Sequence, residues 1–279
     1  ECHSQNFIIL LGGSEGGIPA YAARPFAARG LSVLALGYFS KIPGTPLPPM
    51  IDRIPLEYFE NSFQQVSHLF PDSKCCVLVG FSKGAEAALA VATTANPNFL
   101  GMILLSGTDR AFEGFTRPGG DPSKNSSWIY NGLQIPFSPY VVADGNLEKQ
   151  MYPEGRSKAP VFKPLYDATI RLPTGDRGLY QIQNVKSSIL MFSGEDDQLW
   201  PSSLFFENIV RSAKESGFAN EIRHYSYPKT GHFVLFGEKM LMMDPYNAIQ
   251  FGGTVEGSRA AEVDVWKKTA EYLRKVYGL

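Results

Sequence analysis

This chain of 279 residues has few cysteines and almost no net charge. It has three cysteines, an odd number, and two of them, Cys75 and Cys76, are adjacent inside an apolar run. We therefore expect buried thiols in a reducing compartment, with the cytoplasm as the default location, rather than a disulfide framework. Twenty-six basic residues stand against 27 acidic ones, for a net charge of −1. Without an excess of positive charge, nucleic acid is not expected as a main partner.

Long apolar runs and metal-ligand clusters are also missing from the sequence. No apolar run reaches the roughly 18 residues that cross a bilayer, so no membrane span is expected. No Cys/His cluster has the spacing of a metal site, and neither a metal nor a cofactor is expected. What remains, 44% apolar and 19% charged residues, is typical of a soluble globular enzyme. The first residue is Glu1 rather than Met, as in a chain trimmed at its start.

Short apolar runs alternate with helical patterns along most of the chain. The runs predict buried strands over 6–11, 31–36, 76–80, 101–106, 188–193 and 222–227. Apolar residues at helical spacing predict helices over 18–29, 56–69, 83–95, 202–216 and 258–276. This alternation indicates an α/β fold in which a mostly parallel sheet is flanked by helices.

The stretch 109–186 breaks the alternation. It is rich in Pro, Gly and Asn, carries several aromatic residues and shows no sustained period. Loops of this length are uncommon inside a compact domain unless they are functional. We therefore expect one catalytic domain over 1–279, with 109–186 as a lid over the active site; a solvated insertion is the alternative.

The segment Gly80-Phe-Ser82-Lys-Gly84 carries the sharpest chemical signal. It follows a predicted strand and precedes a predicted helix. Strand, G-x-S-x-G, then helix is the nucleophile elbow of α/β hydrolases, which presents the serine at the carboxyl edge of the sheet. Ser82 is therefore the predicted nucleophile, although a small residue in a tight turn would give the same pattern.

A serine nucleophile needs a base within reach and an acid that orients the base. His232 lies in the loop after the last predicted strand, where this fold places its base, and His224 inside that strand is the alternative. The turn Gly194-Glu-Asp-Asp offers the acid. We favour Asp197 over Asp196 because the fourth position of such a turn usually carries it. The order Ser, Asp, His is that of the fold.

Acyl transfer also needs donors for the developing oxyanion. One predicted donor is the backbone N–H of Lys83, directly after the nucleophile. The glycine-rich turn 12–17 is expected to supply the second from Ser14, with Glu15 as the alternative. A phosphate cradle is the weaker interpretation of this turn, since it lacks both the P-loop and the G-x-G-x-x-G spacing.

Several sequence blocks resemble the acyl-CoA thioesterase / bile acid-CoA:amino acid N-acyltransferase family, which belongs to the α/β-hydrolase superfamily. The blocks are Leu56-Glu-Tyr-Phe-Glu, Gly80-Phe-Ser-Lys-Gly-Ala-Glu86, Gly194-Glu-Asp-Asp-Gln-Leu-Trp200, Tyr227-Pro-Lys-Thr-Gly-His232, Gly252-Gly253 and Ala261-Glu-Val-Asp-Val-Trp-Lys-Lys268. They run in the family's order and leave only 109–186 poorly covered. The resemblance implies that Ser82, Asp197 and His232 form a triad acting on a small-molecule acyl thioester through an acyl-enzyme.

Two departures from the family pattern refine this expectation. Members best known as amino-acid acyltransferases have Cys at the position of Ser82, so Ser82 favours hydrolysis over transfer to an amine or alcohol. Cleavage of oxygen esters is a further alternative. The larger members also have an N-terminal β-sandwich, and the fold usually has two strands before the one at 6–11. Neither is in this sequence, as expected for a short member or for a chain whose upstream piece lies elsewhere.

Overall fold

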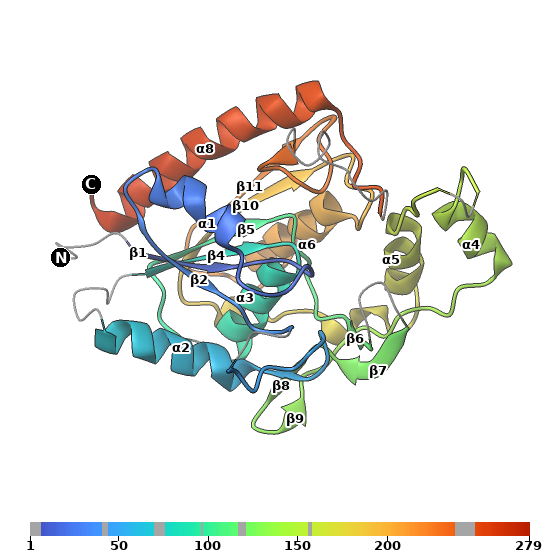
Figure 1. The fold of residues 1–279 in the computed structure, drawn as a ribbon, viewed down its shortest axis with the longest axis horizontal. Coiled ribbons are helices and arrows are strands. Elements are labelled where there is room, and N and C mark those ends of the chain that lie inside the picture. Colours follow the sequence, from blue (N-terminus) through green and yellow to red (C-terminus); the bar gives the residue numbers. More distant parts are fainter. Residues whose placement is uncertain are drawn as a thin grey trace.

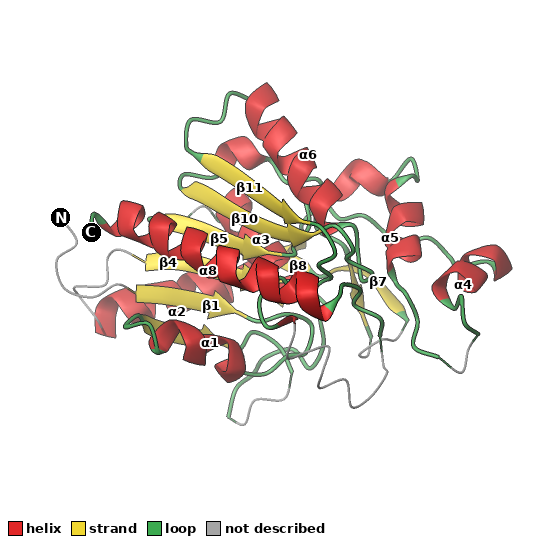
Figure 2. Cartoon of the chain, turned by 90° about the horizontal axis from the view of Figure 1, so that it is seen from above, coloured by secondary structure: helices red, strands yellow, loops and turns green. Residues whose placement is uncertain are grey.

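The centre of the molecule is a six-stranded parallel sheet (Figures 1 and 2). The computed structural model describes residues 7–40, 44–69, 76–95, 97–116, 121–155, 158–237 and 249–279. In spatial order the strands are β11 (Ile222–Tyr227), β10 (Ser188–Gly194), β5 (Gly101–Leu105), β4 (Cys76–Phe81), β1 (Phe7–Leu11) and β2 (Ser32–Leu36). Every neighbouring pair is parallel. The predicted α/β-hydrolase type of fold is confirmed.

Alternate residues of the central strands β1, β4 and β5 face two separate apolar cores, which is why these strands have almost no polar side chains. In β1, Ile9 and Leu11 belong to one core, and Ile8 and Leu10 belong to the other. The first core is covered by α2 (Leu56–Leu69), α3 (Lys83–Thr94) and α6 (Ser202–Glu215), and the second by α1 (Ala20–Ala27) and α8 (Val255–Tyr277). Each strand and helix predicted outside 109–186 is found, with ends within three residues of those expected.

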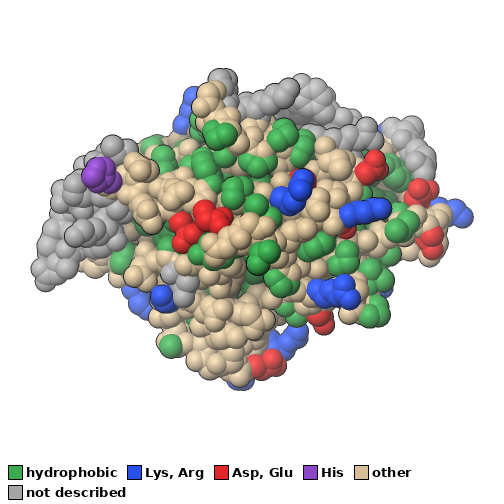
Figure 3. All heavy atoms as spheres, turned by 90° about the horizontal axis from the view of Figure 1, so that it is seen from below, with side chains coloured by type: hydrophobic (Ala, Val, Ile, Leu, Met, Phe, Trp, Pro, Cys, Tyr) green, Lys and Arg blue, Asp and Glu red, His purple; other side chains and the backbone are tan. Residues whose placement is uncertain are grey.

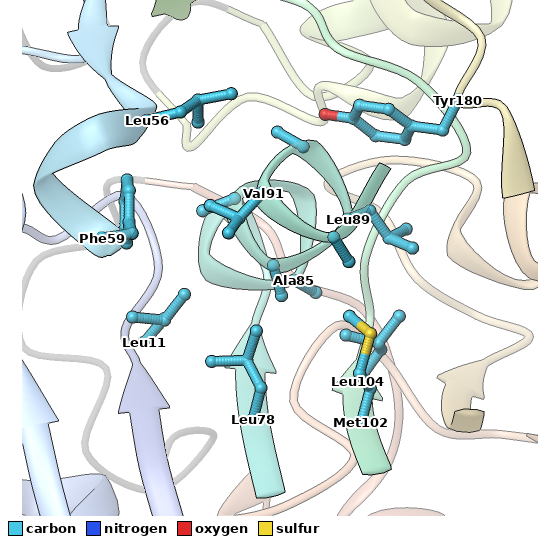
Figure 4. Close-up of a cluster of buried hydrophobic side chains, with 14 of the residues drawn as sticks. Leu11, Leu56, Phe59, Leu78, Ala85, Leu89, Val91, Met102, Leu104 and Tyr180 are labelled. Atoms are coloured by element: carbon cyan, nitrogen blue, oxygen red, sulfur yellow. The ribbon is translucent and has the colours of Figure 1, made fainter. Parts of the chain in front are cut away.

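Helix α3 is the most deeply buried helix of the sheet's first face. Its residues 83–93 are all buried. In Figure 4, Leu78 and Leu104 rise toward α3 from the sheet, while Phe59 of α2 and Tyr180 flank it. Five of its twelve residues are alanine and one is glycine, so it can approach the strands closely. A Cβ on Gly84, for example, would collide with the carbonyl oxygens of Leu11 and Gly12.

Residues 109–186 contain regular structure in short pieces. These are β6 (Glu113–Phe115), β7 (Pro122–Ser126), β8 (Trp128–Tyr130), β9 (Leu133–Gln134), α4 (Gly145–Met151), α5 (Lys163–Ile170) and the 3₁₀ turns η2 (Gly175–Gly178) and η3 (Ile182–Asn184). A further short strand, β3 (Ile54–Pro55), pairs with β8. Elements of two to eight residues are too short to leave a period in the sequence, which explains why none was predicted here.

An aromatic cluster joins this segment to the carboxyl end of the sheet. It comprises Phe112, Tyr140, Tyr166, Trp200 and Phe205. The rings of Phe112 and Tyr140 stack with centroids 5.6 Å apart, and Tyr166 meets Trp200 edge-on at 5.4 Å. The segment is therefore packed onto the loop that follows β10, in addition to being tethered at its two ends.

Two further features concern the apolar character of the helices and the distribution of charge on the surface. Across the parts of the chain that the structure describes, no helix is both long and apolar enough to cross a membrane. On the face shown in Figure 3, acidic and basic side chains stand in small separate groups among apolar ones, and charge of one sign does not cover that face.

Candidate active site

The carboxyl ends of the central strands meet at one edge of the sheet. Leu11 lies beside Gly80 in the register of β1 and β4, and Phe81 lies beside Leu105 in that of β4 and β5. Phe192 of β10 lies beside Leu105 on the far side. The loops that follow these strands carry the glycine-rich turn, Ser82 and the acidic turn, so the topology gathers the predicted site.

Ser82 occupies a strained turn between β4 and α3. Its φ of +51° and ψ of −120° lie in a region that non-glycine residues rarely adopt. The backbone N–H of Ser82 donates to the Leu105 carbonyl at 2.8 Å, which ties the turn to β5. Glycine is needed at 80 because a Cβ there would lie 2.6 Å from Cα of Ala85. These features match the predicted nucleophile elbow.

Ser82, His232 and Asp197 lie in one hydrogen-bonded row. His232 Nε2 is 2.8 Å from Ser82 Oγ, and His232 Nδ1 is 2.9 Å from Asp197 Oδ2. The side chains of His232 and Asp197 are only 2% and 1% exposed. The backbone N–H of His232 donates to the Phe251 carbonyl at 2.8 Å, which holds the loop in place. The structure thus brings the three predicted residues together, and their catalytic roles stay a prediction.

The carboxylate of Asp197 is held from both of its oxygens. Oδ1 accepts the backbone N–H groups of Leu199 at 2.9 Å and Trp200 at 3.3 Å. Oδ2 accepts the hydroxyl of Ser202 at 2.6 Å in addition to its contact with His232. Ser202 is fully buried at the start of α6 and was not predicted as a site residue. Its place behind a predicted acid, at a helix start, is the only signal that the sequence offered.

Asp196 and His224, the alternative acid and the alternative base, have hydrogen-bond partners outside the row of Ser82, His232 and Asp197. Asp196 accepts the backbone N–H of Gly253 at 2.8 Å and the Gln198 amide at 2.7 Å, so it braces the loop. His224 lies on β11 with its Nε2 2.7 Å from Ser193 Oγ. Burial lowers the pKa of His224 to about 4. Neither has a hydrogen bond to Ser82 or His232 among the described residues.

The predicted oxyanion donors border the nucleophile. Lys83 is the first residue of α3, where a backbone N–H has no partner within the helix. The glycine-rich turn approaches Ser82 at Gly13, where a Cβ would lie 3.1 Å from Cβ of Ser82. Gly13 and Ser14 both line the cavity beside Ser82. The backbone N–H of Gly13 donates to Glu15 Oε1 at 3.1 Å, so the Glu15 side chain shapes this turn. The roles of the Lys83 and Ser14 amides stay predictions.

A buried ion pair lies directly behind the elbow, and only the backbone of one of its members was predicted to take part. Lys83 Nζ is 2.6 Å from Glu86 Oε1, with side chains 3% and 0% exposed. The same oxygen accepts the backbone N–H of Phe112 at 3.2 Å and the indole N–H of Trp128 at 2.9 Å. Burial raises the pKa of Glu86 and lowers that of Lys83. The sequence did carry a signal for this ion pair, since its two opposite charges stand three residues apart in an otherwise alanine-rich helix.

A cavity of about 1180 Å³ opens onto Ser82 and His232. Its wall is mostly apolar, and the segment 109–186 contributes much of it. Lining residues from that segment include Phe115, Phe137, Tyr140, Val141, Met151, Phe162, Leu165 and Tyr166. Charged lining residues are few: Glu15, Lys83, Glu113, Asp121 and Lys124. The cavity can therefore hold a large apolar group next to the serine hydroxyl.

Possible metal ligands and thiols were predicted to play no part in the site. Within the described residues, no group of three or more His, Cys, Asp or Glu side chains is arranged to hold a metal ion. Cys76 is half-buried in β4, where burial raises the pKa of its thiol to about 12. A thiol with so high a pKa is a poor nucleophile near neutral pH. The prediction for Cys75 falls outside the described residues.

Comparison of the sequence with known proteins gives three informative matches. Residues 157–278 match the family model described as BAAT / Acyl-CoA thioester hydrolase C terminal. The chain is 25% identical to mitochondrial acyl-coenzyme A thioesterase 2 of Mus musculus, over 97% of this chain and 55% of that protein. It is 24% identical to acyl-coenzyme A amino acid N-acyltransferase 2 of Rattus norvegicus, over 96% of this chain and 59% of that protein. The chain thus spans little more than half the length of these relatives, and the matches confirm the predicted resemblance.

Solved structures with the same fold include two hydrolases. An α/β-hydrolase enzyme from a deep-sea metagenome library superposes with a TM-score of 0.52 at 15% identity, covering 100% of this chain and 87% of that one. An esterase of Pyrococcus furiosus gives a TM-score of 0.51 at 11% identity, covering 99% of this chain and 83% of that one. At these identities the likeness shows the fold alone.

Proposed function

We propose that the chain is a serine hydrolase of acyl thioesters, because it is similar over nearly its whole length to an acyl-CoA thioesterase and an acyl-CoA amino acid N-acyltransferase. The row Ser82–His232–Asp197, with contacts of 2.8 and 2.9 Å, is the observation that carries the proposal. These contacts join a nucleophile, a base and an orienting acid, the three parts that acyl transfer through a serine requires.

The first half of the proposed reaction acylates the serine. His232 accepts the proton of Ser82 at Nε2 as Oγ attacks the thioester carbonyl. Asp197 keeps the Nδ1 proton on the far side of the ring and stabilises the imidazolium. The backbone N–H groups of Lys83 and Ser14 receive the oxyanion. The tetrahedral intermediate then collapses, the C–S bond breaks, and His232 donates its proton to the leaving thiolate.

The second half releases the acid. His232 removes a proton from water as the water oxygen attacks the acyl-serine carbonyl. Collapse of the second tetrahedral intermediate breaks the bond to Ser82 Oγ, which regains its proton from His232. Water is favoured as the acceptor because the nucleophile is an oxygen rather than a sulfur, and an oxygen ester transfers its acyl group to amines less readily than a thioester does.

Residues 109–186 are proposed to act as a lid over this site within a single catalytic domain. Support comes from the aromatic cluster that packs them onto the Asp197 loop and from their large share of the cavity wall. The volume of about 1180 Å³ and the apolar wall favour an extended or bulky apolar acyl group.

The decisive experiment uses substrates of increasing acyl chain length and measures thiol release from acyl-CoA thioesters and p-nitrophenolate release from acyl p-nitrophenyl esters. Ser82→Ala and His232→Ala should each remove nearly all turnover, and the double variant should be little slower than either one, because the two side chains act as a unit. Circular dichroism serves as the folding control. Losses that add up in the double variant would contradict a common role.

Acyl transfer and oxygen-ester cleavage are separated from thioester hydrolysis in the same assay. Adding an amine or alcohol acceptor and analysing the products distinguishes free acid from amide or ester. A product that is mainly amide would replace hydrolysis by transfer as the function. Faster cleavage of matched oxygen esters than of thioesters would assign the site to carboxylesters.

A further inference from the structure

One carboxylate stands beside the nucleophile without a role in the proposed reaction. Glu15 follows Ser14 on the glycine-rich turn and lines the cavity that contains Ser82. Its Oε1 accepts two hydrogen bonds, from the backbone N–H of Gly13 at 3.1 Å and from the hydroxyl of Tyr21 on α1 at 3.0 Å. Two donors from different elements hold the charge at a defined place, although the side chain is exposed to solvent.

The carboxylate lies close to the reacting atoms. The point where a Cβ on Gly13 would lie is 2.7 Å from Glu15 Oε2 and 3.5 Å from Ser82 Oγ. These two distances limit the separation of the two oxygens to about 6 Å. Any group bound next to Ser82 on this side of the cavity therefore lies within a few ångströms of a negative charge.

Two other charged groups of the cavity, Lys83 and Glu113, are held by partners of their own. Among the described ranges, Glu15 has no lysine or arginine within ion-pairing distance, and Lys83 is paired with Glu86. Glu113 is bound to the backbone N–H groups of Lys124 and Tyr140. Burial and the neighbouring negative charge of Glu15 together raise the pKa of Tyr21, which also lines the cavity.

We propose that Glu15 is a specificity-determining residue that selects thioesters by the charge of the group next to the sulfur, favouring cationic leaving groups over neutral ones and disfavouring anionic ones. This inference rests on the proposed thioester hydrolysis. Coulomb interaction of unit charges about 6 Å apart corresponds to a factor of roughly 3 to 100 in rate, from water-like to surface-like screening. Coenzyme A is compatible with such a filter, because its neutral pantetheine arm separates the sulfur from the phosphates.

The test uses three thioesters of one acyl group. Their thiols are thiocholine, its neutral isostere 3,3-dimethylbutanethiol, and the anionic 3-mercaptopropionate. For the wild type we expect kcat/KM, divided by the rate of uncatalysed hydrolysis of each thioester to remove the different acidities of the thiols, to fall in that order, with at least a threefold step per unit of charge. Glu15→Gln keeps an oxygen that can accept from Gly13 and Tyr21 while removing the charge, and it should flatten the series. Glu207→Gln, on the exposed face of α6, is the matched control and should leave the series unchanged.

Salt separates a charge filter from a purely structural role of Glu15. The wild-type preference should shrink as ionic strength rises, because screening weakens interactions near the surface. If Glu15→Gln instead slows all three thioesters equally, or if the wild-type series is flat, the inference is overturned. Labelling of Ser82 by phosphonothiolates with the same three leaving groups gives the charge preference independently of thioester turnover. Labelling that prefers the cation in a protein unable to hydrolyse any thioester would overturn the proposed function but leave the charge preference of Glu15 for the leaving group standing.

Discussion

Replacing Lys83 by methionine tests the energetics of the ion pair behind the nucleophile. The two side chains are buried, with Lys83 Nζ 2.6 Å from Glu86 Oε1. Methionine keeps most of the apolar stem but leaves the carboxylate with the N–H groups of Phe112 and Trp128 as its donors. Breaking a buried pair by removing one partner costs about 3–5 kcal/mol when the remaining charge stays ionised.

The cost of this substitution should depend on pH, because Glu86 can take up a proton. Burial already raises the pKa of Glu86 above its ordinary value of 4.5, and loss of the ammonium raises it further. Above pH 4.5 the unfolded chain releases a proton that the folded protein retains. Stability therefore falls as pH rises, by up to about 1.4 kcal/mol per pH unit, until the folded pKa is reached. We expect Lys83→Met to be about 1 kcal/mol less stable than the wild type at pH 5 and about 3–5 kcal/mol less stable at pH 8.

Urea unfolding followed by tryptophan fluorescence between pH 5 and pH 8 measures this difference. The midpoint should move while the slope stays constant, which identifies a change in stability rather than in compactness. The control is Lys83→Met combined with Glu86→Gln, which has no titrating carboxylate at position 86 and should not show the growing loss of stability with pH that Lys83→Met shows. A deficit of Lys83→Met that is constant across the range, or one whose pH dependence persists in the double variant, would refute the reasoning.

Three further predictions test the acidic turn, the hydrogen bond of Ser202 and the burial of His224. Asp197→Asn should lower kcat about 10³- to 10⁴-fold. Asp196→Asn should lower kcat less than about tenfold, because Asp196 braces a loop. The opposite order in steady-state assays would show that Asp196 is the acid. Ser202→Ala removes a hydrogen bond that competes with His232 for Asp197. The acid limb of the pH profile of kcat/KM should therefore move to higher pH, and kcat should fall about tenfold. Ser202→Thr should restore both the limb and kcat. An unmoved limb would argue against this role. Burial lowers the pKa of His224 to about 4, so between pH 6.5 and 4 the unfolded chain takes up a proton that the folded protein does not, and about 2–3 kcal/mol of stability is lost. His224→Gln should remove that part of the acid sensitivity in urea unfolding, and an unchanged profile would contradict the burial argument.

The sheet and its helices were predictable from local patterns. A strand buried on both faces must be apolar at every position, and an amphipathic or small-residue helix must follow it to cover one face. For this reason the runs at 76–80 and 188–193 and the helices at 83–95 and 202–216 were located within a residue or two. Because parallel strands share one carboxyl edge, the sequence also indicated that the loops after them would meet.

The segment 109–186 was predictable only in outline. Its strands and helices are two to eight residues long, and they are stabilised by contacts with the rest of the molecule rather than by their own periodicity. The pairing of β8 with β3 joins residues about 70 positions apart, and the aromatic cluster joins Tyr140 to Trp200 through Tyr166. Contacts over such distances leave no local trace in the sequence.

Four parts of the site could be predicted from the sequence, because each depends on residues that are neighbours in the chain. They are the glycine-rich turn, the elbow, the loop histidine and the acidic turn. Which carboxylate of the acidic turn meets His232, what Ser202 and Glu86 contact, and how near Glu15 stands to Ser82 depend on where side chains from separate loops point. Those directions follow from the packing of the strands, helices and inserted segment against one another, and only the tertiary structure contains them.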